Sequence, residues 1–139
     1  MKTLIITIIL TIWTCPNILD TPPKVVNQTF KEKFPSAKNI TWTKKDKFVW
    51  EVNFNLNEKK VYACFYIDGH WILTRMNISI TDLREDIKTS IMEYYPNCEI
   101  KTIERTENIG SGIYYDIKFK CGDKETNEIF DSNGLRIRI

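Results

Sequence analysis

An alternation of apolar and polar residues from Phe48 to Trp71 constrains the fold of this chain more than any other feature. The stretch FVWEVNFNL has an apolar side chain at every second position, and VYACFYI repeats the alternation shortly afterwards. Successive side chains of a strand point to opposite faces of a sheet, so each stretch presents one apolar face. The pair Asp68-Gly69 is typical of a two-residue hairpin turn. The segment therefore predicts antiparallel strands joined by tight turns.

The same outline returns in the second half of the chain, from Ile113 to Arg136. There IYYDIKFKC alternates with the same period, and Asn133-Gly134 takes the place of Asp68-Gly69. The strand that follows the Gly122-Asp123 turn is more polar than its counterpart in the first half. The recurrence predicts that the chain contains two copies of one structural unit.

A predicted helix precedes each set of strands. Apolar residues recur at four-residue spacing in both, which places them on one helical stripe: Val26, Phe30 and Phe34, and then Leu83, Ile87, Ile91 and Tyr95. Each stripe ends immediately before a proline, which disfavours helical backbone in the residue before it. Thr21 with Pro22 can start the first helix, and Ser79 or Thr81 can cap the second.

These patterns predict an α+β fold, a tandem duplication of a helix followed by a four-stranded antiparallel sheet. The first α+β repeat covers residues 25–78 and the second covers residues 79–139. A unit of this size buries too little surface to be stable alone, so we expect the two repeats to form one compact domain. They can share a core or join their sheets edge to edge.

The first residues predict an export signal. Lys2 precedes an apolar run from Leu4 to Trp13, which has the length of a signal peptide and is too short to span a bilayer comfortably. We assign residues 1–15 to a signal peptide and residues 16–24 to a spacer. Cys15 is either discarded with the leader or carries a lipid anchor. The expected location is periplasmic or secreted, and an outer-membrane lipoprotein if Cys15 is acylated.

Composition excludes a nucleic-acid binder. The 139 residues carry a formal net charge of +2, with 20 basic and 18 acidic side chains. Proteins that bind nucleic acid neutralise several phosphates with clustered lysine and arginine. Lys44, Lys45 and Lys47 lie close together, but Asp46 interrupts them, and a solvated turn explains them better than a phosphate site. The apolar fraction of 42% is enough for a hydrophobic core.

Cys98 and Cys121 are candidates for a disulfide. If the turn between Thr106 and Gly112 closes symmetrically near Gly110, residues whose numbers sum to about 219 face each other, which places Cys98 opposite Cys121. Export would permit the bond, and the alternative is two small buried side chains. Cys64 would then be left unpaired.

No set of residues predicts catalysis, a metal or a cofactor. His70 is the single histidine. The hairpin register places it about three residues along the ladder from Cys64, roughly 10 Å away, which is too far for proton transfer. One histidine and no CxxC motif make a zinc site improbable, and the stretch DSNG is better explained as a turn than as a calcium loop. We therefore expect a protein that is not an enzyme.

The sheet surface opposite the helices is the candidate binding site. Even positions of the strand near Phe48 and odd positions of the next strand would face the helix. The opposite side would then show Tyr, Trp, Leu and Arg side chains, types that concentrate binding energy at interfaces: Tyr62, Tyr66, Trp71, Leu73, Tyr114, Arg136 and Arg138. An apolar outward face of this kind indicates a partner. The alternative is that some of these residues lie inside or simply cover a small sheet.

Several short stretches carry a resemblance to a known family. They are FKEKFPSAKNITW, FVWEVNF and CFYIDGHW, followed by IMEYYPNCEIKTI, YYDIKF and IFDSNGL. With the leader, they resemble the PepSY-like family, also described as β-lactamase-inhibitor-like, over about residues 25 to 139. The resemblance implies an exported bacterial protein without known catalysis. It also implies tandem helix-plus-four-strand units whose sheet presents a concave, protein-binding face.

We therefore predict a non-enzymatic exported binding module that contacts a protein or peptide through its open sheet face, in an inhibitor-like manner. The alternative is a protein that binds a small ligand or a component of the cell envelope.

Overall fold

The computed structural model describes residues 21–138. The predicted signal peptide at residues 1–15, the possible anchor at Cys15 and residues 16–20 of the predicted spacer lie outside the described residues. None of the helices in the described part of the chain is both long and apolar enough to cross a membrane.

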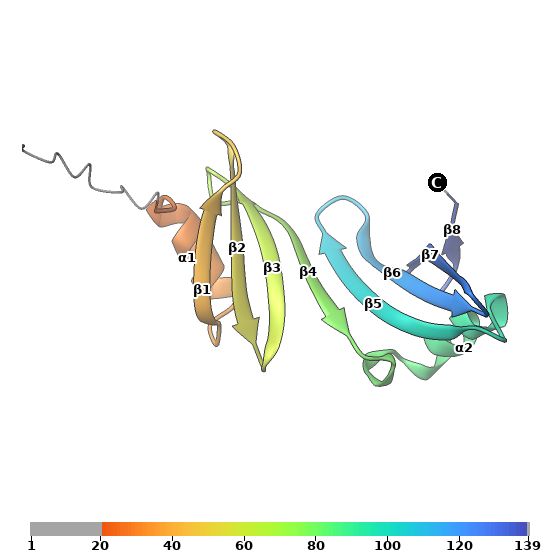
Figure 1. Cartoon of the computed structure of the whole chain (residues 1–139). Coiled ribbons are helices and arrows are strands. Elements are labelled where there is room, and N and C mark those ends of the chain that lie inside the picture. Colours follow the sequence, from red (N-terminus) through yellow and green to blue (C-terminus); the bar gives the residue numbers. More distant parts are fainter. Residues whose placement is uncertain (1–20, 139) are drawn as a thin grey trace, which may run out of the picture.

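The described chain contains two α-helices, one short 3₁₀ helix and eight strands (Figure 1). In chain order they are α1 (Lys24–Lys33), β1 (Lys38–Lys44), β2 (Val49–Leu56), β3 (Lys59–Tyr66), β4 (Trp71–Ile78), η1 (Ile80–Asp82), α2 (Glu85–Tyr94), β5 (Glu99–Asn108), β6 (Gly112–Cys121), β7 (Lys124–Asp131) and β8 (Arg136–Ile137).

The strands form one eight-stranded antiparallel sheet in the order β1 to β8. The prediction of two four-stranded sheets is therefore wrong. Strands β4 and β5 pair continuously from Leu73 opposite Asn108 to Ile78 opposite Ile103, so the two halves share one ladder of main-chain hydrogen bonds. Pairing these two strands covers edges that would otherwise be open to other chains. The duplication of a unit remains a prediction.

Both helices pack on the same face of this sheet, which we call the helix face. Two hydrophobic clusters lie there. One joins Val26 and Phe30 of α1 to apolar side chains of β2 and β3, and the other joins Ile87 and Ile91 of α2 to β5, β6 and β7. Met76 packs against the first cluster and Ile78, two residues further along β4, packs against the second. Residues two apart in a strand point the same way, so the clusters share one face.

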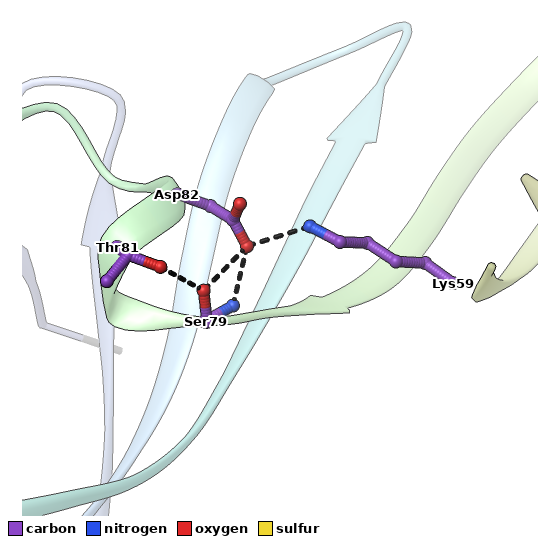
Figure 2. A network of polar contacts seen from close by, with 4 residues as sticks. All are labelled: Lys59, Ser79, Thr81 and Asp82. Carbon is purple, nitrogen blue, oxygen red and sulfur yellow. Dashed lines mark hydrogen bonds and ion pairs between the residues drawn. The ribbon is translucent and has the colours of Figure 1, made fainter. Parts of the chain in front are cut away.

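The connection from β4 to α2 is held by a polar network (Figure 2). The side chain of Ser79 and that of Asp82 form a capping box around η1: the Asp82 carboxylate accepts hydrogen bonds from the Ser79 backbone N–H at 2.8 Å and from its hydroxyl at 2.9 Å. Ser79 thus caps η1, and the prediction that Ser79 or Thr81 caps the second α-helix is wrong, because α2 begins at Glu85 with Arg84 at its N-cap.

Candidate binding face

The face of the sheet opposite the helices, which we call the open face, carries the candidate site. Six buried residues of β2 and β3 point to the helix face: Trp50, Val52, Phe54, Val61, Ala63 and Phe65. The residues between them point to the open face, and the register of β3 with β4 and of β4 with β5 carries the alternation across the sheet. The open face has no helix over it within residues 21–138.

A hydrogen-bonded cluster lies on the open face of β2 and β3. The Tyr62 hydroxyl donates to Glu51 Oε1 at 2.6 Å, and the Cys64 thiol donates to the Tyr62 oxygen at 3.0 Å. Lys45 Nζ forms an ion pair with the same Glu51 oxygen at 3.0 Å. These bonds to its carboxylate lower the pKa of Glu51, the Tyr62 bond being the largest cause, while burial raises the pKa of Tyr62 well above its usual value. The cluster therefore holds the Tyr62 ring in a fixed position.

Arg75 lies beside this cluster on β4. Its guanidinium sits over the Tyr62 ring, 5.7 Å from the centroid, and its Nε is 3.2 Å from Glu104 Oε1 on β5. The Nε atom is nonetheless buried and makes no hydrogen bond among the described residues. The hydroxyl of Thr106, which pairs with Arg75 across the ladder and is 1% exposed, also has no partner there. Both polar groups are at the centre of the open face.

The open face is hollowed next to Arg75. A hollow of about 420 Å³ is lined by residues of β1 to β5, and four of them are asparagines: Asn39, Asn53, Asn55 and Asn77. Lys60, Tyr62, Arg75 and Glu104 complete the polar part of the lining. A second hollow of about 340 Å³ shares Asn39 and Asn55 with the first. We call the two together the asparagine hollow.

Four of the seven residues predicted for partner binding lie on the open face. Tyr62, Cys64 and Tyr66 alternate along β3, Leu73 pairs with Cys64, and Tyr114 pairs with Thr106. Tyr66 is the most exposed, at 46%. Tyr62, Leu73 and Tyr114 are partly buried.

Trp71 lies on the helix face, so its predicted place on the open face is wrong. The register of β3 and β4 shifts between Cys64, which pairs with Leu73, and Phe65, which pairs with Trp71. This irregularity turns Trp71 to the side of Phe65, where it packs against the cluster under α1. Its indole N–H donates to Thr74 Oγ1 at 2.9 Å, and Lys33 of α1 lies 4.0 Å from its ring centroid.

Arg136 is also misplaced by the prediction. It pairs with Phe130, a buried residue of the helix face, and its guanidinium binds Glu128 through Nε at 2.7 Å and through a terminal nitrogen at 2.8 Å. The Tyr95 hydroxyl donates to the same carboxylate at 2.6 Å, and together these bonds lower the pKa of Glu128. Arg136 therefore lies on the helix face at the β8 edge of the sheet, bound to Glu128. Arg138 is exposed just beyond β8.

The cysteines and His70 occupy the following places. Cys98 and Cys121 form a disulfide with their Cα atoms 4.4 Å apart, next to the pair Glu99–Lys120, whose numbers sum to 219. Cys64 is free and buried, and burial raises the pKa of its thiol. His70 lies in the hairpin, where its Nδ1 is 3.0 Å from Asp68. No group of three or more His, Cys, Asp or Glu residues within residues 21–138 is arranged to hold a metal ion.

Two features of the open face were missed by sequence reasoning: Arg75 and the asparagines. Asparagine is depleted in strands, so Asn53 and Asn55 inside a clear alternating pattern were a usable signal. The predicted site contained only Tyr, Trp, Leu and Arg residues, so these carboxamides were not part of it.

Together, the sheet and its helices define a class of fold: one antiparallel sheet with helices on one face and the other face open. No protein-family model matches the sequence, and no curated protein sequence matches it. Solved structures do match the fold.

One is a BLIP-like protein from Bacteroides fragilis, with a TM-score of 0.73, 19% identity, and coverage of 85% of this chain and 84% of that chain. A second is a DUF2874 family protein from Bacteroides ovatus, with a TM-score of 0.72, 22% identity and 86% of each chain covered. A third, from Bacteroides eggerthii, is described as "putative periplasmic proteins"; its TM-score is 0.70, its identity 15%, and the coverage is 85% of this chain and 87% of that chain. At these identities the likeness establishes a BLIP-like fold, while the PepSY resemblance remains a prediction.

Proposed function

We propose that this protein is an exported, non-enzymatic module that binds a protein or peptide through its open face. The observation that carries the proposal is the set of residues Tyr62, Tyr66, Leu73 and Tyr114 on a sheet face with no helix over it in the described chain. Tyrosine offers a large contact area with a polar end and is enriched where binding energy concentrates. The BLIP-like fold of a structural neighbour supports a protein partner, and the neighbour described as periplasmic supports export.

The chemistry of the cysteine and the histidine supports the absence of catalysis. A thiolate nucleophile needs a lowered pKa, whereas burial raises the pKa of the Cys64 thiol. His70 is 73% exposed in a hairpin turn and contacts Asp68, not a thiol or hydroxyl nucleophile. Inhibition of a secreted hydrolase is the strongest form of the proposal.

The test is an affinity capture from the envelope and culture medium of the source organism, with residues 21–139 as bait. Tyr66→Ala removes a side chain that is 46% exposed on the open face. Tyr94→Ala, on α2, removes a tyrosine of the same 46% exposure on the other side of the molecule and is the matched control. We expect one protein to be recovered by the native bait and by Tyr94→Ala, and to be lost with Tyr66→Ala.

Equal recovery by all three baits would move the interface away from Tyr66. Recovery of nothing, at bait concentrations that capture micromolar complexes, would contradict a protein partner in that source.

A further inference from the structure

The asparagine hollow offers more hydrogen-bonding capacity than the protein itself uses. None of the side chains of Asn39, Asn53, Asn55 and Asn77 has a hydrogen-bond partner within residues 21–138, although all four line the hollow. Each carboxamide provides one acceptor oxygen and two N–H donors. Asn39, Asn53 and Asn77 are exposed, so four such groups around one hollow can exchange water for a ligand that both donates and accepts.

The asparagines are unfavourable choices for the strands that carry them. Asn53 and Asn55 lie inside β2, and Asn77 lies inside β4. Strand positions on a solvent-facing sheet favour threonine and other β-branched residues, and asparagine is depleted there. Three asparagines gathered around one hollow therefore reduce strand stability, which is typical of positions kept for a ligand.

The other polar residues of the lining hold Arg75 in place and keep the net charge of the hollow low. Arg75 is held between the Tyr62 ring and Glu104, and its ion pair with Glu104 offsets the two opposite charges. Its Nε atom is buried and lies 3.2 Å from Glu104 Oε1, so it belongs to the fixed part of the lining. Lys60 is exposed at the margin. The inner lining is thus close to neutral and rich in both donors and acceptors, which does not suit an apolar or a strongly anionic ligand.

The two parts of the hollow adjoin, because they share Asn39 and Asn55 as lining residues. The part of about 340 Å³ continues from the shared residues Asn39 and Asn55 to Asn57 and Ser36, near the β2–β3 turn. Tyr66 lies at the opposite end of β3 from Lys59, and it lines neither part of the asparagine hollow. The hollow can therefore hold a chain of several small polar units at some distance from Tyr66.

We propose that the asparagine hollow binds a neutral oligosaccharide. Each sugar hydroxyl both donates and accepts a hydrogen bond, which matches paired carboxamide groups and the Arg75–Glu104 pair better than any ligand that only donates or only accepts. The volume of about 420 Å³ is within the range of small-ligand sites, and the oligomeric form follows from the continuation beyond Asn55. This activity goes beyond the protein binding proposed above and does not depend on it.

The test uses the side-chain amide signals of uniformly ¹⁵N-labelled protein in solution. Residues 21–139 are titrated with neutral trisaccharides of glucose, galactose, mannose and N-acetylglucosamine, each up to about 10 mM, a range that detects millimolar dissociation constants. A trialanine peptide and glucuronic acid form the other arms. We expect at least one trisaccharide to shift the carboxamide signals of Asn53 and Asn77 with saturation, and the peptide and the acid to leave them unchanged.

Variants separate the site from the rest of the open face. Asn53→Thr combined with Asn77→Thr is expected to weaken the trisaccharide about tenfold or more, because two hydrogen-bonding groups are lost. Thermal unfolding should show this variant to be folded and at least as stable as the native chain, since threonine suits strands. Asn127→Thr, an exposed asparagine of β7 on the same face, is the matched control and should bind like the native protein.

Tyr66→Ala should also keep the trisaccharide, so loss of a protein partner and loss of the sugar are distinguishable. The proposal is overturned if no trisaccharide moves the carboxamide signals, if the peptide or the acid moves them instead, or if the Asn53→Thr/Asn77→Thr variant binds as tightly as Asn127→Thr.

Discussion

Lys59 and Asp82 form an ion pair between parts of the chain 23 residues apart, with Lys59 Nζ 2.8 Å from Asp82 Oδ2 (Figure 2). Lys59 begins β3, next to the β2–β3 turn, and Asp82 ends η1, just before α2. The same carboxylate oxygen accepts hydrogen bonds from the backbone and hydroxyl of Ser79. One side chain therefore ties the first half of the sheet to the connection that leads into the second helix.

This pair predicts a pH dependence of stability. The Lys59 ammonium, followed by the Ser79 donors, lowers the pKa of Asp82 from 3.8 to about 2. A carboxyl whose pKa is lower in the folded state stabilises the fold above its unfolded pKa, and this contribution is lost as the pH falls. We expect Asp82→Asn to lower the urea midpoint at pH 7, and the difference from the native protein to shrink between about pH 4 and pH 2.

Asp123→Asn, in the β6–β7 turn, is the control for removing one acidic side chain and should have a smaller effect at pH 7. A midpoint difference for Asp82→Asn that is unchanged from pH 7 to pH 2 would contradict the assigned role of its carboxylate.

The Cys98–Cys121 disulfide predicts a second measurable contribution. It joins the residue before β5 to the last residue of β6, across a sequence separation of 23. Closing a loop of this size restricts the unfolded chain and contributes about 3 kcal/mol on the chain-entropy model. We expect Cys98→Ala combined with Cys121→Ala to lower the free energy of unfolding in urea by about that amount.

Reductant supplies the control for the disulfide. It should lower the stability of the native chain towards that of the double variant and leave the double variant unchanged. Equal stability of the native and doubly substituted proteins under oxidising conditions would be inconsistent with the bond.

The two hairpin glycines predict a matched pair of effects. Gly69 has a φ of +92°, and a Cβ added there would lie 2.7 Å from Val25 Cγ2 on α1. Gly134 has a φ of +78°, and a Cβ added there would lie 3.1 Å from the Ile87 carbonyl oxygen on α2. Gly69→Ala and Gly134→Ala should each destabilise the fold by more than the ~1 kcal/mol of left-handed strain alone. Gly122→Ala, with φ of +62° and open space around it, should show only the strain.

Equal urea midpoints for the three glycine variants would show that the close contacts with α1 and α2 add no destabilisation beyond the left-handed strain. Far-ultraviolet circular dichroism of each variant establishes that it is folded before the midpoints are compared.

The elements of this fold could be anticipated because side-chain periodicity records which face of each element is buried. The stripe Val26, Phe30 and Phe34 and the alternation through Trp50, Val52 and Phe54 correspond to buried side chains. Sheet continuity could not be anticipated in the same way. The β4–β5 ladder is made by backbone C=O groups, which every residue carries, and N–H groups, which only proline lacks, so it leaves no pattern in the side chains.

The predicted site was only partly right because strand periodicity reports a face correctly only while the register is regular. One irregularity between Cys64 and Phe65 turned Trp71 from the predicted open face to the helix face. Arg136 was expected on the open face, whereas its pairing with Phe130 places it on the helix face, beside Glu128. Glu128 and Arg136 are only eight residues apart, but their contact depends on the β7–β8 register, which side-chain alternation alone does not fix.

Trp71 carries the last prediction, which separates a structural role from a binding role. Its ring packs against the cluster under α1, Lys33 lies 4.0 Å from the ring centroid, and its indole N–H donates to the buried Thr74. Truncating a buried large aromatic residue typically destabilises a protein by 3–5 kcal/mol, and Trp71 is partly exposed, so we expect Trp71→Ala to lower the free energy of unfolding by about 2–3 kcal/mol.

Tyr66→Ala is the comparison, because its side chain is 46% exposed on the open face and should change the stability by less than about 1 kcal/mol. Urea unfolding followed by circular dichroism measures both variants without relying on tryptophan fluorescence. A Trp71→Ala protein as stable as the native chain would place the indole outside the helix face and restore it as a candidate contact residue.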